Sequence, residues 1–432
     1  MDCFEIEGGV PLHGEVTLSG AKNAALPMMA ASLLTRDKIR LRRVPRLSDI
    51  EVMTQVLRGL GVAVEWSGPD CLEMQVQDEK SAVAPYDLVC KMRASICVLG
   101  PLLGRRGWAR VALPGGCAIG PRPIDLHLKG MRALGAEVVI EHGDVIGNAV
   151  KLLGNEIYLA GPNGSTVLGT ANVMCAATLA AGTTVIDDAA CEPEIVELAK
   201  LLNKMGARIG DIGTKRITIE GVEELHGAEY ELPPDRIEAG TFMVAGAVTR
   251  GNVLVRGTRR EDLGAIIDAL RNIGVQIIPE KEGCRVIGPE EFQTIDLATN
   301  PFPGLPTDMQ AQLMVLLCLA KGVSIFTERV YTDRFMHIAE LNRMRANIRK
   351  EGCSAIVVGV DYLSGAPVMA SDLRASAALV LASLIARGKT SISRVYHIDR
   401  GYERIEQKLA GLGAHIRRVK DTSQTSSLAE AG

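Results

Sequence analysis

The chain has 432 residues, and its 48 Lys and Arg residues nearly balance its 51 Asp and Glu residues, which gives a formal net charge of −3 at pH 7. This balance argues against a nucleic-acid partner, because duplex binding needs a concentrated positive charge. Aromatic residues make up only 3% of the chain, which also argues against base stacking along a single strand. No secretory leader and no apolar run of membrane length is visible, and the ten cysteines form no C-x-x-C pair. We therefore expect a cytoplasmic protein with reduced thiols, no membrane span, no metal site and no other cofactor.

A Leu-rich phrase that ends in a glycine and continues as a short β-type run recurs along the chain. Each copy is typical of an amphipathic helix, a glycine C-cap and a strand. The copies lie about 70 residues apart, with one interval twice as long, and their glycines are Gly61, Gly135, Gly206, Gly274 and Gly413. The long interval contains LNRMRANIRKEG, where Arg345 occupies the glycine position.

An Ala-rich helical phrase that turns into a β-branched or basic strand repeats with the same period. Its six turn residues are Asp37, Gly107, Gly182, Gly251, Gly322 and Gly388. Two interleaved patterns that share one period argue against coincidence among Leu, Ala and Gly. The sequence therefore predicts six α/β units, each with two helices that alternate with strands, and two domains of three units are the economical packing.

Polar or charged residues stand at the start of each Ala-rich helix. Capping explains Asp235 and Ser165 well, because short polar side chains satisfy the free backbone N–H groups of a first turn. Capping explains cations poorly, since a positive side chain is locally unfavourable at the positive end of a helix dipole. An anionic ligand held between several helix starts explains Lys22, Arg93 and Arg374 better.

Residues 113–130, LPGGCAIGPRPIDLHLKG, contain so many glycines and prolines that the pattern predicts a loop able to move over a site. The loop holds Cys117, with Arg122 five residues on, and a thiol near guanidinium groups titrates low and acts as an acid or nucleophile. Towards the C-terminus, Arg400 precedes Gly401 in a turn-like context that suits presentation to a ligand. We expect His337 and His397 to be solvated charges at helix starts.

The motifs LSGAKNAALP, PGGCAIGPRPIDLH, PTDMQAQ, DRFMH, DLRASAALVLA and IDRGYERIE resemble those of the UDP-N-acetylglucosamine enolpyruvyl transferases, in the same order along residues 1–420. The resemblance implies a two-domain α/β fold, an inside-out α/β barrel, with a threefold repeat in each domain and the active site between the domains. It assigns residues 22–233 to the first domain and residues 1–21 with 234–420 to the second. We expect the polar tail, residues 421–432, to be disordered.

The resemblance also implies the reaction: the enolpyruvyl group moves from phosphoenolpyruvate to the 3′-hydroxyl of UDP-N-acetylglucosamine, and phosphate is released. This is the first committed step of bacterial peptidoglycan synthesis, and therefore of cell-wall biogenesis. By this resemblance Lys22, Arg122 and Arg400 hold phosphoenolpyruvate, Lys22 and Cys117 supply or relay a proton, and Asp308 is the base for the sugar hydroxyl. Cys117 is also the residue that epoxides of the fosfomycin type would modify. The other residues implied for the substrate site are Asn23, Arg93, Pro123, Ile124, Asp125, Leu126, Thr166, Val167, Val330, Arg334, Asp372 and Arg374.

Two departures and two alternatives accompany this hypothesis. The loop GPNGSTVLGTAN is longer than is usual in the family, which affects Thr166 and Val167, and Ser48 stands where a Lys is common. A transferase that acts on shikimate 3-phosphate shares the architecture but lacks the PGGC loop. A non-catalytic paralogue that binds the UDP-sugar would be expected to lose Lys22, Cys117, Asp308 or Arg400, and all four are present.

Overall fold

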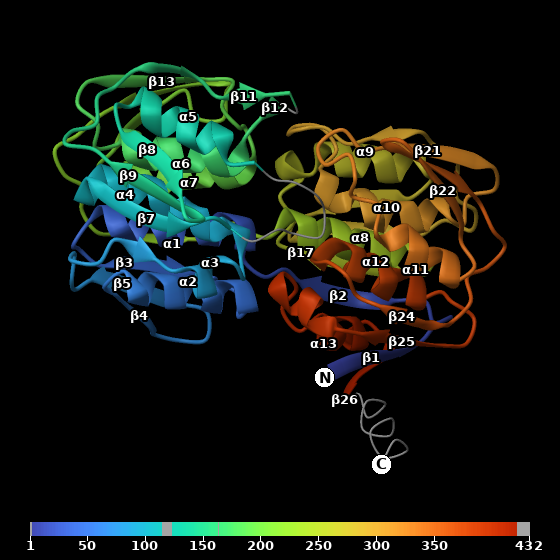
Figure 1. Ribbon diagram of the computed structural model, residues 1–432. Coiled ribbons are helices and arrows are strands. Elements are labelled where there is room, and N and C mark those ends of the chain that lie inside the picture. Colours follow the sequence, from blue (N-terminus) through green and yellow to red (C-terminus); the bar gives the residue numbers. More distant parts are fainter. Residues whose placement is uncertain (1, 115–122, 163, 421–432) are drawn as a thin grey trace, which may run out of the picture.

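Six four-stranded sheets repeat one strand pattern in the computed structural model, which describes residues 2–114, 123–162 and 164–420. In each sheet one edge strand runs parallel to its neighbour and the remaining neighbours are antiparallel. Three sheets lie in the first lobe, on the left of Figure 1, and three in the second. The predicted α/β fold of six repeated units is confirmed.

The first-lobe sheets contain β16 (Ala228–Glu231), β3 (Ile39–Arg42), β5 (Leu72–Val76) and β4 (Val62–Trp66); β6 (Val83–Ala84), β7 (Trp108–Ala112), β9 (Asp144–Asn148) and β8 (Glu137–Glu141); and β10 (Glu156–Tyr158), β13 (Thr183–Asp187), β15 (Arg216–Glu220) and β14 (Arg208–Gly210). A small hairpin of β11 (Ala160–Gly161) and β12 (Gly164–Ser165) accompanies them.

The second-lobe sheets contain β2 (His13–Thr17), β17 (Asn252–Arg256), β19 (Gly283–Ile287) and β18 (Gln276–Glu280); β20 (Leu297–Ala298), β21 (Val323–Thr327), β23 (Ser354–Val358) and β22 (Asn347–Glu351); and β24 (Pro367–Met369), β25 (Lys389–Ser393), β1 (Asp2–Glu7) and β26 (His415–Lys420). The N-terminal strands β1 and β2 therefore pair with strands of the C-terminal half of the chain.

Two kinds of helix alternate along the chain, as the two sequence phrases predict. The Ala-rich helices are buried over most of their length, and they are α1 (Lys22–Ala31), α4 (Leu99–Arg106), α6 (Val167–Ala177), α8 (Arg236–Val248), α10 (Gln310–Leu317) and α12 (Leu373–Ser383). The amphipathic helices bury one face, and they are α2 (Ser48–Gly59), α5 (Asp125–Ala133), α7 (Pro193–Lys204), α9 (Gly264–Asn272), α11 (His337–Arg343) and α13 (Ile405–Gly411). A single short turn, α3 (Tyr86–Val89), follows β6.

A left-handed residue follows each amphipathic helix at the predicted position. The φ angles are 83° at Gly61, 92° at Gly135, 100° at Gly206, 103° at Gly274 and 101° at Gly413. Arg345 has a φ of 75° and takes the same conformation, although a side chain makes it costly there. Arg345 is exposed, and its guanidinium lies 3.9 Å from the ring centre of Tyr362. The sixth repeat therefore exists in the structure with an arginine in place of the glycine.

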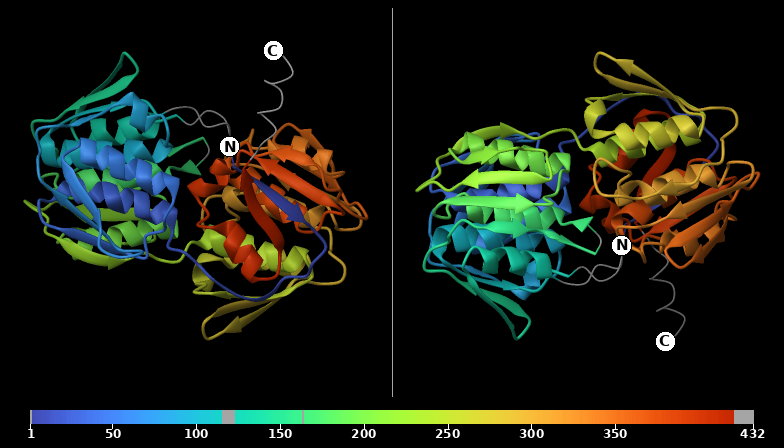
Figure 2. Two further views of the ribbon diagram at one scale, coloured as in Figure 1. Left: turned by 90° about the horizontal axis from the view of Figure 1, so that it is seen from below. Right: turned by 90° about the horizontal axis from the view of Figure 1, so that it is seen from above.

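Helices fill the middle of each lobe and sheets form its outside, as the end-on views in Figure 2 show. The buried apolar side chains fall into two clusters. One takes its residues from positions 21–232, and the other from positions 4–18 and 237–414. We propose that these two clusters are the cores of two domains.

The chain crosses between the lobes twice, and the two crossings lie side by side. Gly20 and Pro234 form an antiparallel bridge, and Ala21 N donates to Pro233 O at 2.8 Å. A Cβ atom at Gly20 would lie 1.8 Å from the carbonyl oxygen of Arg43, so only glycine fits this crossing.

Three local expectations from the sequence are wrong. The loop predicted over 113–130 ends before residue 125, because α5 begins at Asp125. Residues 125–129 contain neither Gly nor Pro, so they can form a helix. Thr166, and not Ser165, caps α6, since Thr166 Oγ1 accepts from Gly169 N at 3.2 Å. His337 is no solvated charge: it is 2% exposed, burial lowers its pKa to about 4, and its Nε2 lies 3.3 Å from the Met314 sulfur.

His397 departs from the same expectation to a smaller degree. It is half-buried, and burial together with the nearby charge of Arg400 lowers its pKa. The neutral form is therefore favoured at this position.

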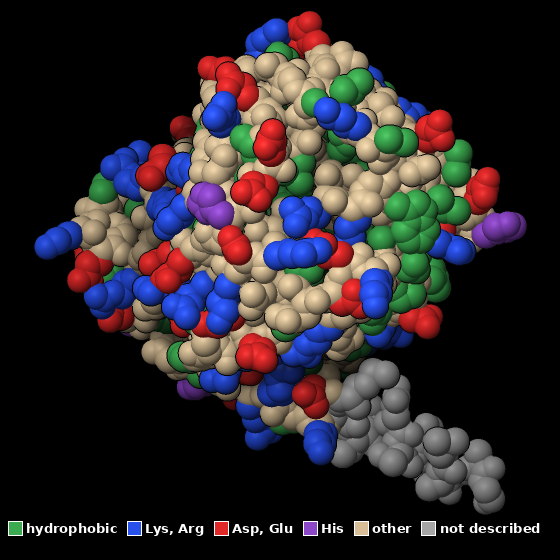
Figure 3. Space-filling view, turned by 90° about the vertical axis from the view of Figure 1, so that its left-hand side faces the viewer, with side chains coloured by type: hydrophobic (Ala, Val, Ile, Leu, Met, Phe, Trp, Pro, Cys, Tyr) green, Lys and Arg blue, Asp and Glu red, His purple; other side chains and the backbone are tan. Residues whose placement is uncertain are grey.

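Acidic and basic side chains alternate on the face of the first lobe seen in Figure 3. Within the sheets of this lobe, Arg40 of β3 pairs with Glu73 of β5 at 2.6 Å, and Arg110 of β7 pairs with Asp144 of β9 at 2.6 Å. None of the helices in the described part of the chain combines the length and the apolar character needed to cross a bilayer. Within residues 2–114, 123–162 and 164–420, no three His, Cys, Asp or Glu side chains gather in a way that would hold a metal ion.

Candidate active site

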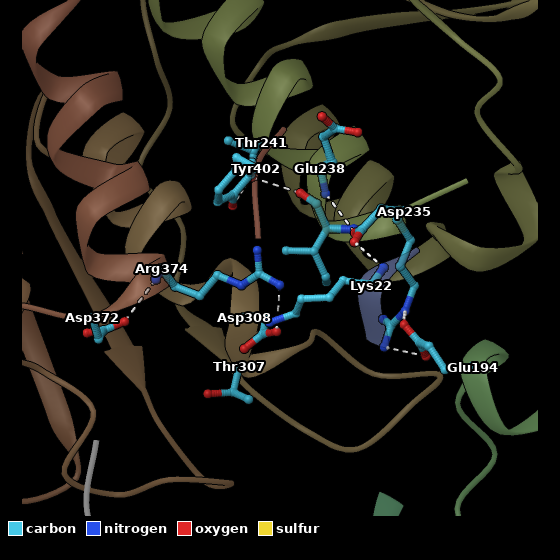
Figure 4. A network of polar contacts seen from close by, with 12 residues as sticks. Lys22, Glu194, Asp235, Glu238, Thr241, Thr307, Asp308, Asp372, Arg374 and Tyr402 are labelled. Carbon is cyan, nitrogen blue, oxygen red and sulfur yellow. Dashed lines mark hydrogen bonds and ion pairs between the residues drawn. The ribbon is translucent and has the colours of Figure 1, made fainter. Parts of the chain in front are cut away.

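Lys22 and Asp235 lie where the two crossing segments enter their helices. Asp235 caps α8, because its Oδ1 accepts from the backbone N–H groups of Ile237 at 2.8 Å and Glu238 at 3.0 Å. Its other oxygen, Oδ2, accepts from the backbone N–H of Lys22 at 3.3 Å. The start of α1 is thus tied to the start of α8, and the Lys22 side chain is held at the junction of the lobes (Figure 4).

Asp49 connects Lys22 to Arg400. Lys22 Nζ lies 2.8 Å from Asp49 Oδ2, and Arg400 Nε lies 2.9 Å from Asp49 Oδ1. Lys22 and Asp49 are both buried, and Asp49 belongs to the first lobe whereas Arg400 belongs to the second. Burial alone would raise the pKa of Asp49, but the charges of Lys22 and Arg400 outweigh it and lower that pKa. This carboxylate therefore stays ionised and joins the two lobes.

Asp308 lies between two buried arginines of the second lobe. Arg334 Nη1 donates to Asp308 Oδ1 at 2.7 Å, and Arg374 Nη2 donates to Asp308 Oδ2 at 3.1 Å. Burial would raise the pKa of Asp308, but Arg374, Arg334 and Lys22 lower it far below its usual range. The Asp308 side chain still has 25% of its surface exposed, so a ligand can reach it. Lys22 extends towards Asp308 from the first lobe (Figure 4).

Arg374 is placed by the cap of its own helix. Asp372 Oδ1 accepts from the backbone N–H groups of Arg374 at 2.8 Å and Ala375 at 3.1 Å, which fixes the first turn of α12. The Arg374 side chain is 3% exposed, and its guanidinium lies 5.3 Å from the ring centre of Tyr402. Its Nε and Nη1 make no hydrogen bond of good geometry with the described residues. Buried donors without acceptors cost free energy, so they favour an anionic ligand at this position.

The lobes also meet through a second group of ion pairs beside these residues. Glu194 on α7 of the first lobe pairs with Arg236 on α8 of the second, with Arg236 Nε 3.0 Å from Glu194 Oε1. Glu197 pairs with Arg259 at 3.0 Å. These contacts stabilise the present arrangement of the lobes and hold the junction around Lys22 together.

Arg93 and Pro123, two residues predicted for the substrate site, lie together in the first lobe. Arg93 Nη2 donates to the Pro123 carbonyl oxygen at 3.0 Å, and Pro123 directly precedes Ile124 and the start of α5. Asn172 on α6 lies behind them: its Nδ2 donates to Ile96 O at 2.9 Å and lies 2.8 Å from His127 Nδ1. His127 is buried, and burial and Arg93 lower its pKa to about 3, so it stays neutral and structural.

The structure brings together much of the predicted site but leaves part of it undescribed. Lys22, Asp308, Arg334, Arg374 and Arg400 meet at the lobe junction. Asn23 follows Lys22 on α1, and Val330 lies in the turn after β21. Thr166 and Val167 start α6 next to the hairpin β11–β12. Asp125 and Leu126 open α5. Cys117 and Arg122 lie outside the described residues.

Two features of the site were missed or misjudged from the sequence. Asp49 was missed, because an acidic residue in the first turn of an amphipathic helix is common for local reasons. Lys22 and Arg374 are matched in part by carboxylates of the protein itself, Asp49 and Asp308, so an external anion is not their only counter-charge.

Comparisons with known proteins identify the family of this chain. The protein family described as EPSP synthase (3-phosphoshikimate 1-carboxyvinyltransferase) matches residues 6–409. The UDP-N-acetylglucosamine 1-carboxyvinyltransferase of Methylacidiphilum infernorum is 51% identical over 420 residues, which cover 97% of this chain and 99% of that protein. UDP-N-acetylglucosamine 1-carboxyvinyltransferase 1 of Caldanaerobacter subterraneus subsp. tengcongensis is 52% identical over 415 residues, 96% of this chain and 99% of that protein.

Solved structures show the same fold. The enolpyruvyl transferase NikO from Streptomyces tendae superposes with a TM-score of 0.87 at 25% identity and covers 97% of this chain and 99% of its own. EPSP synthase from Acinetobacter baumannii has a TM-score of 0.75 at 17% identity, with 97% of this chain and 100% of its own covered, and supports the fold alone. The identities near 51% over almost the whole chain are far higher than those to EPSP synthase. The chain belongs to the UDP-N-acetylglucosamine 1-carboxyvinyltransferase family of enolpyruvyl transferases.

Proposed function

We propose that this chain transfers the enolpyruvyl group of phosphoenolpyruvate to the 3′-hydroxyl of UDP-N-acetylglucosamine and releases phosphate. The reaction is the first committed step of peptidoglycan synthesis, and we assign it to the cytoplasm. One observation carries the proposal: Lys22, Arg400, Arg374 and Asp308 lie together at the lobe junction. The chain that contains them is about half identical to proteins named UDP-N-acetylglucosamine 1-carboxyvinyltransferase.

Phosphoenolpyruvate carries a phosphate and a carboxylate, and both need cationic partners. Lys22 and Arg400 are held 2.8 and 2.9 Å from one shared carboxylate, so their charged ends already converge. Arg374 offers buried donors that make no hydrogen bond of good geometry with the described residues, and guanidinium donors suit oxyanions. We assign phosphoenolpyruvate to these cations, together with Arg122.

The chemistry is an addition followed by an elimination. In the addition, C3 of the enol gains a proton while C2 becomes cationic and bonds to the sugar oxygen. In the elimination, C3 loses a proton and the C2–O bond to phosphate breaks. Lys22 and Cys117 are the proposed groups that carry the C3 proton. The cations around the phosphate stabilise it as a leaving group.

Asp308 is the proposed acceptor of the sugar hydroxyl proton. Its lowered pKa makes it a weak base towards a free alcohol. The hydroxyl becomes strongly acidic only as its oxygen bonds to the cationic C2, so a weak but permanently ionised acceptor is sufficient. Arg334 and Arg374 keep Asp308 ionised and fix where its oxygens point.

A coupled measurement tests the proposal. The purified chain is incubated with phosphoenolpyruvate and UDP-N-acetylglucosamine, phosphate release is followed, and the sugar product is identified by its mass. We expect release only when both substrates are present. A parallel reaction with shikimate 3-phosphate as acceptor should release no phosphate. Phosphate release with shikimate 3-phosphate but not with UDP-N-acetylglucosamine would favour the alternative transferase. Binding of UDP-N-acetylglucosamine without any turnover would favour the non-catalytic paralogue.

A further inference from the structure

Glu328 is a fully buried carboxylate next to the site that the proposed reaction does not use directly. It follows β21 immediately, and its side chain is 0% exposed. A carboxylate that is removed from water must be matched by hydrogen-bond donors or it destabilises the fold. Its two oxygens accept hydrogen bonds from residues 330–331, from Thr299 and from Thr307. Val330 and Asp308, which follows Thr307, are predicted substrate contacts.

The first oxygen organises the turn that contains Val330. Glu328 Oε1 accepts from the backbone N–H groups of Val330 at 2.8 Å and Tyr331 at 3.0 Å. It also accepts from Thr299 Oγ1 at 2.6 Å, and that hydroxyl in turn accepts from Arg329 N at 2.9 Å. The backbone of 328–331 is therefore folded around one carboxylate oxygen.

The second oxygen organises the residues beside Asp308. Thr307 Oγ1 donates to Glu328 Oε2 at 2.9 Å. A hydroxyl has one proton, so once that proton points at Glu328 the oxygen can only accept from its other neighbours. Arg334 Nη1 lies 3.0 Å from Thr307 Oγ1 and also donates to Asp308 Oδ1 at 2.7 Å. Thr307 lies next to Asp308 at the junction (Figure 4).

We propose that Glu328 is a positioning residue for the acceptor sugar, and this inference rests on the proposed function. The carboxylate fixes the Val330 turn with one oxygen. With the other it orients Thr307, which places Arg334 against Asp308. Glu328 thus sets the relative position of the two segments between which the sugar hydroxyl would bind. Lys22 and Arg400, two of the cations assigned to phosphoenolpyruvate, are instead held by Asp49 of the first lobe.

The test is a kinetic comparison of Glu328→Gln with the unmodified chain. Glutamine keeps the size of the side chain but replaces one acceptor oxygen with an amide donor, which conflicts with donors already in place. We expect kcat to fall about tenfold and the KM for UDP-N-acetylglucosamine to rise about tenfold, whereas the KM for phosphoenolpyruvate stays within about twofold. Thr307→Val should show the same split, and the double variant should be little worse than either single variant.

Ser324→Ala supplies the matched control. Ser324 lies on β21, the strand that Glu328 follows, and is 1% exposed. Its hydroxyl accepts from Ile295 N at 3.1 Å, away from the site. Its loss should leave both KM values unchanged. If Glu328→Gln does not fold, Thr307→Val tests the same connection, because the other three donors to Glu328 remain.

The outcomes separate the inference from the function on which it rests. Failure of the unmodified chain to turn over rejects the proposed function. Normal turnover by that chain, with unchanged kinetics in Glu328→Gln, or in Thr307→Val if the first variant does not fold, rejects the positioning role alone. An equal rise in both KM values also rejects it, because a merely structural residue would weaken both substrates alike.

Discussion

Arg400 of the second lobe and Asp49 of the first are joined across the junction at 2.9 Å, and Lys22 reaches the same carboxylate from α1 at 2.8 Å. One acidic side chain thus holds two of the cations assigned to phosphoenolpyruvate at a set distance from each other. Preorganisation of this kind contributes to catalysis because a displaced charge loses most of its effect.

Asp49→Asn should therefore lower turnover. Without the carboxylate charge, Lys22 and Arg400 repel each other and lose their common partner, and we expect kcat/KM for phosphoenolpyruvate to fall by about 10²-fold. Steady-state kinetics measures the effect. Glu403→Gln is the control, because Glu403 also joins the lobes, by accepting from Ser19 Oγ at 2.9 Å and Arg46 N at 2.9 Å, but touches neither cation. Equal losses in both variants would mean that Asp49 acts only as a contact between lobes.

Asp308→Asn should cut turnover by about 10²-fold or more while UDP-N-acetylglucosamine still binds. The amide keeps the shape of the side chain but cannot accept the hydroxyl proton. Phosphate release and calorimetric titration of the sugar nucleotide measure the two effects separately. Turnover close to that of the unmodified chain would remove the role of base from Asp308.

Asp262 makes stability depend on pH. Burial raises its pKa from 3.8 to about 6 in the folded chain, so the folded state favours the protonated carboxyl. Relative to higher pH, such a carboxyl adds most to the free energy of unfolding when the pH is below its pKa in the unfolded chain, near 3.8. This contribution is lost as the pH rises through about 6. Asp262→Asn should therefore raise the free energy of unfolding at pH 7 but hardly at pH 4. Urea unfolding of both proteins at the two pH values checks this, and an equal gain at both would contradict it.

Arg345 provides a test of backbone strain. Arg345→Ala removes the contact with Tyr362 and keeps a Cβ atom at a φ of 75°, whereas Arg345→Gly removes the contact and the strain together. We expect the glycine variant to be more stable than the alanine variant by about 1 kcal/mol in denaturant unfolding. If alanine is as stable as glycine, the left-handed conformation costs nothing at this position.

Reactivity towards an epoxide of the fosfomycin type should be confined to Cys117. Burial raises the pKa of Cys97 and of Cys318 to about 12, so these thiols supply almost no thiolate at neutral pH. We expect Cys117→Ser to abolish labelling, as followed by intact mass. Cys353→Ser, which removes an exposed thiol, should leave it unchanged. Persistent labelling of Cys117→Ser would identify another thiol as the target.

The repeated architecture could be predicted because it is encoded in local patterns. Each unit carries its own Ala-rich helix, amphipathic helix and left-handed turn, so the period survives even where Arg345 replaces the glycine. The pairing of β1 between β25 and β26, and of β16 with β3, could not be predicted in the same way. These pairs join residues that are far apart in the sequence, and no local pattern specifies them.

The residues of the candidate site also differ in whether a local sequence pattern reveals them. Lys22 and Arg374 were recognisable because cations are unusual at helix starts. Asp49 and Glu328 were not, because their importance depends on partners that only the folded chain brings near. His337 was misjudged for the same reason: its surroundings are decided by Met314 on a separate helix.

The paired crossings at Gly20 and Pro234 also constrain how the molecule can move. The two crossing segments are tied together by the Gly20–Pro234 bridge, so one lobe can rotate relative to the other only if both segments turn together. Lys22 comes two residues after Gly20, and Asp235 comes one residue after Pro234. Because Lys22 directly follows one of these segments, a rotation of the lobes would also reposition the residue assigned to proton transfer.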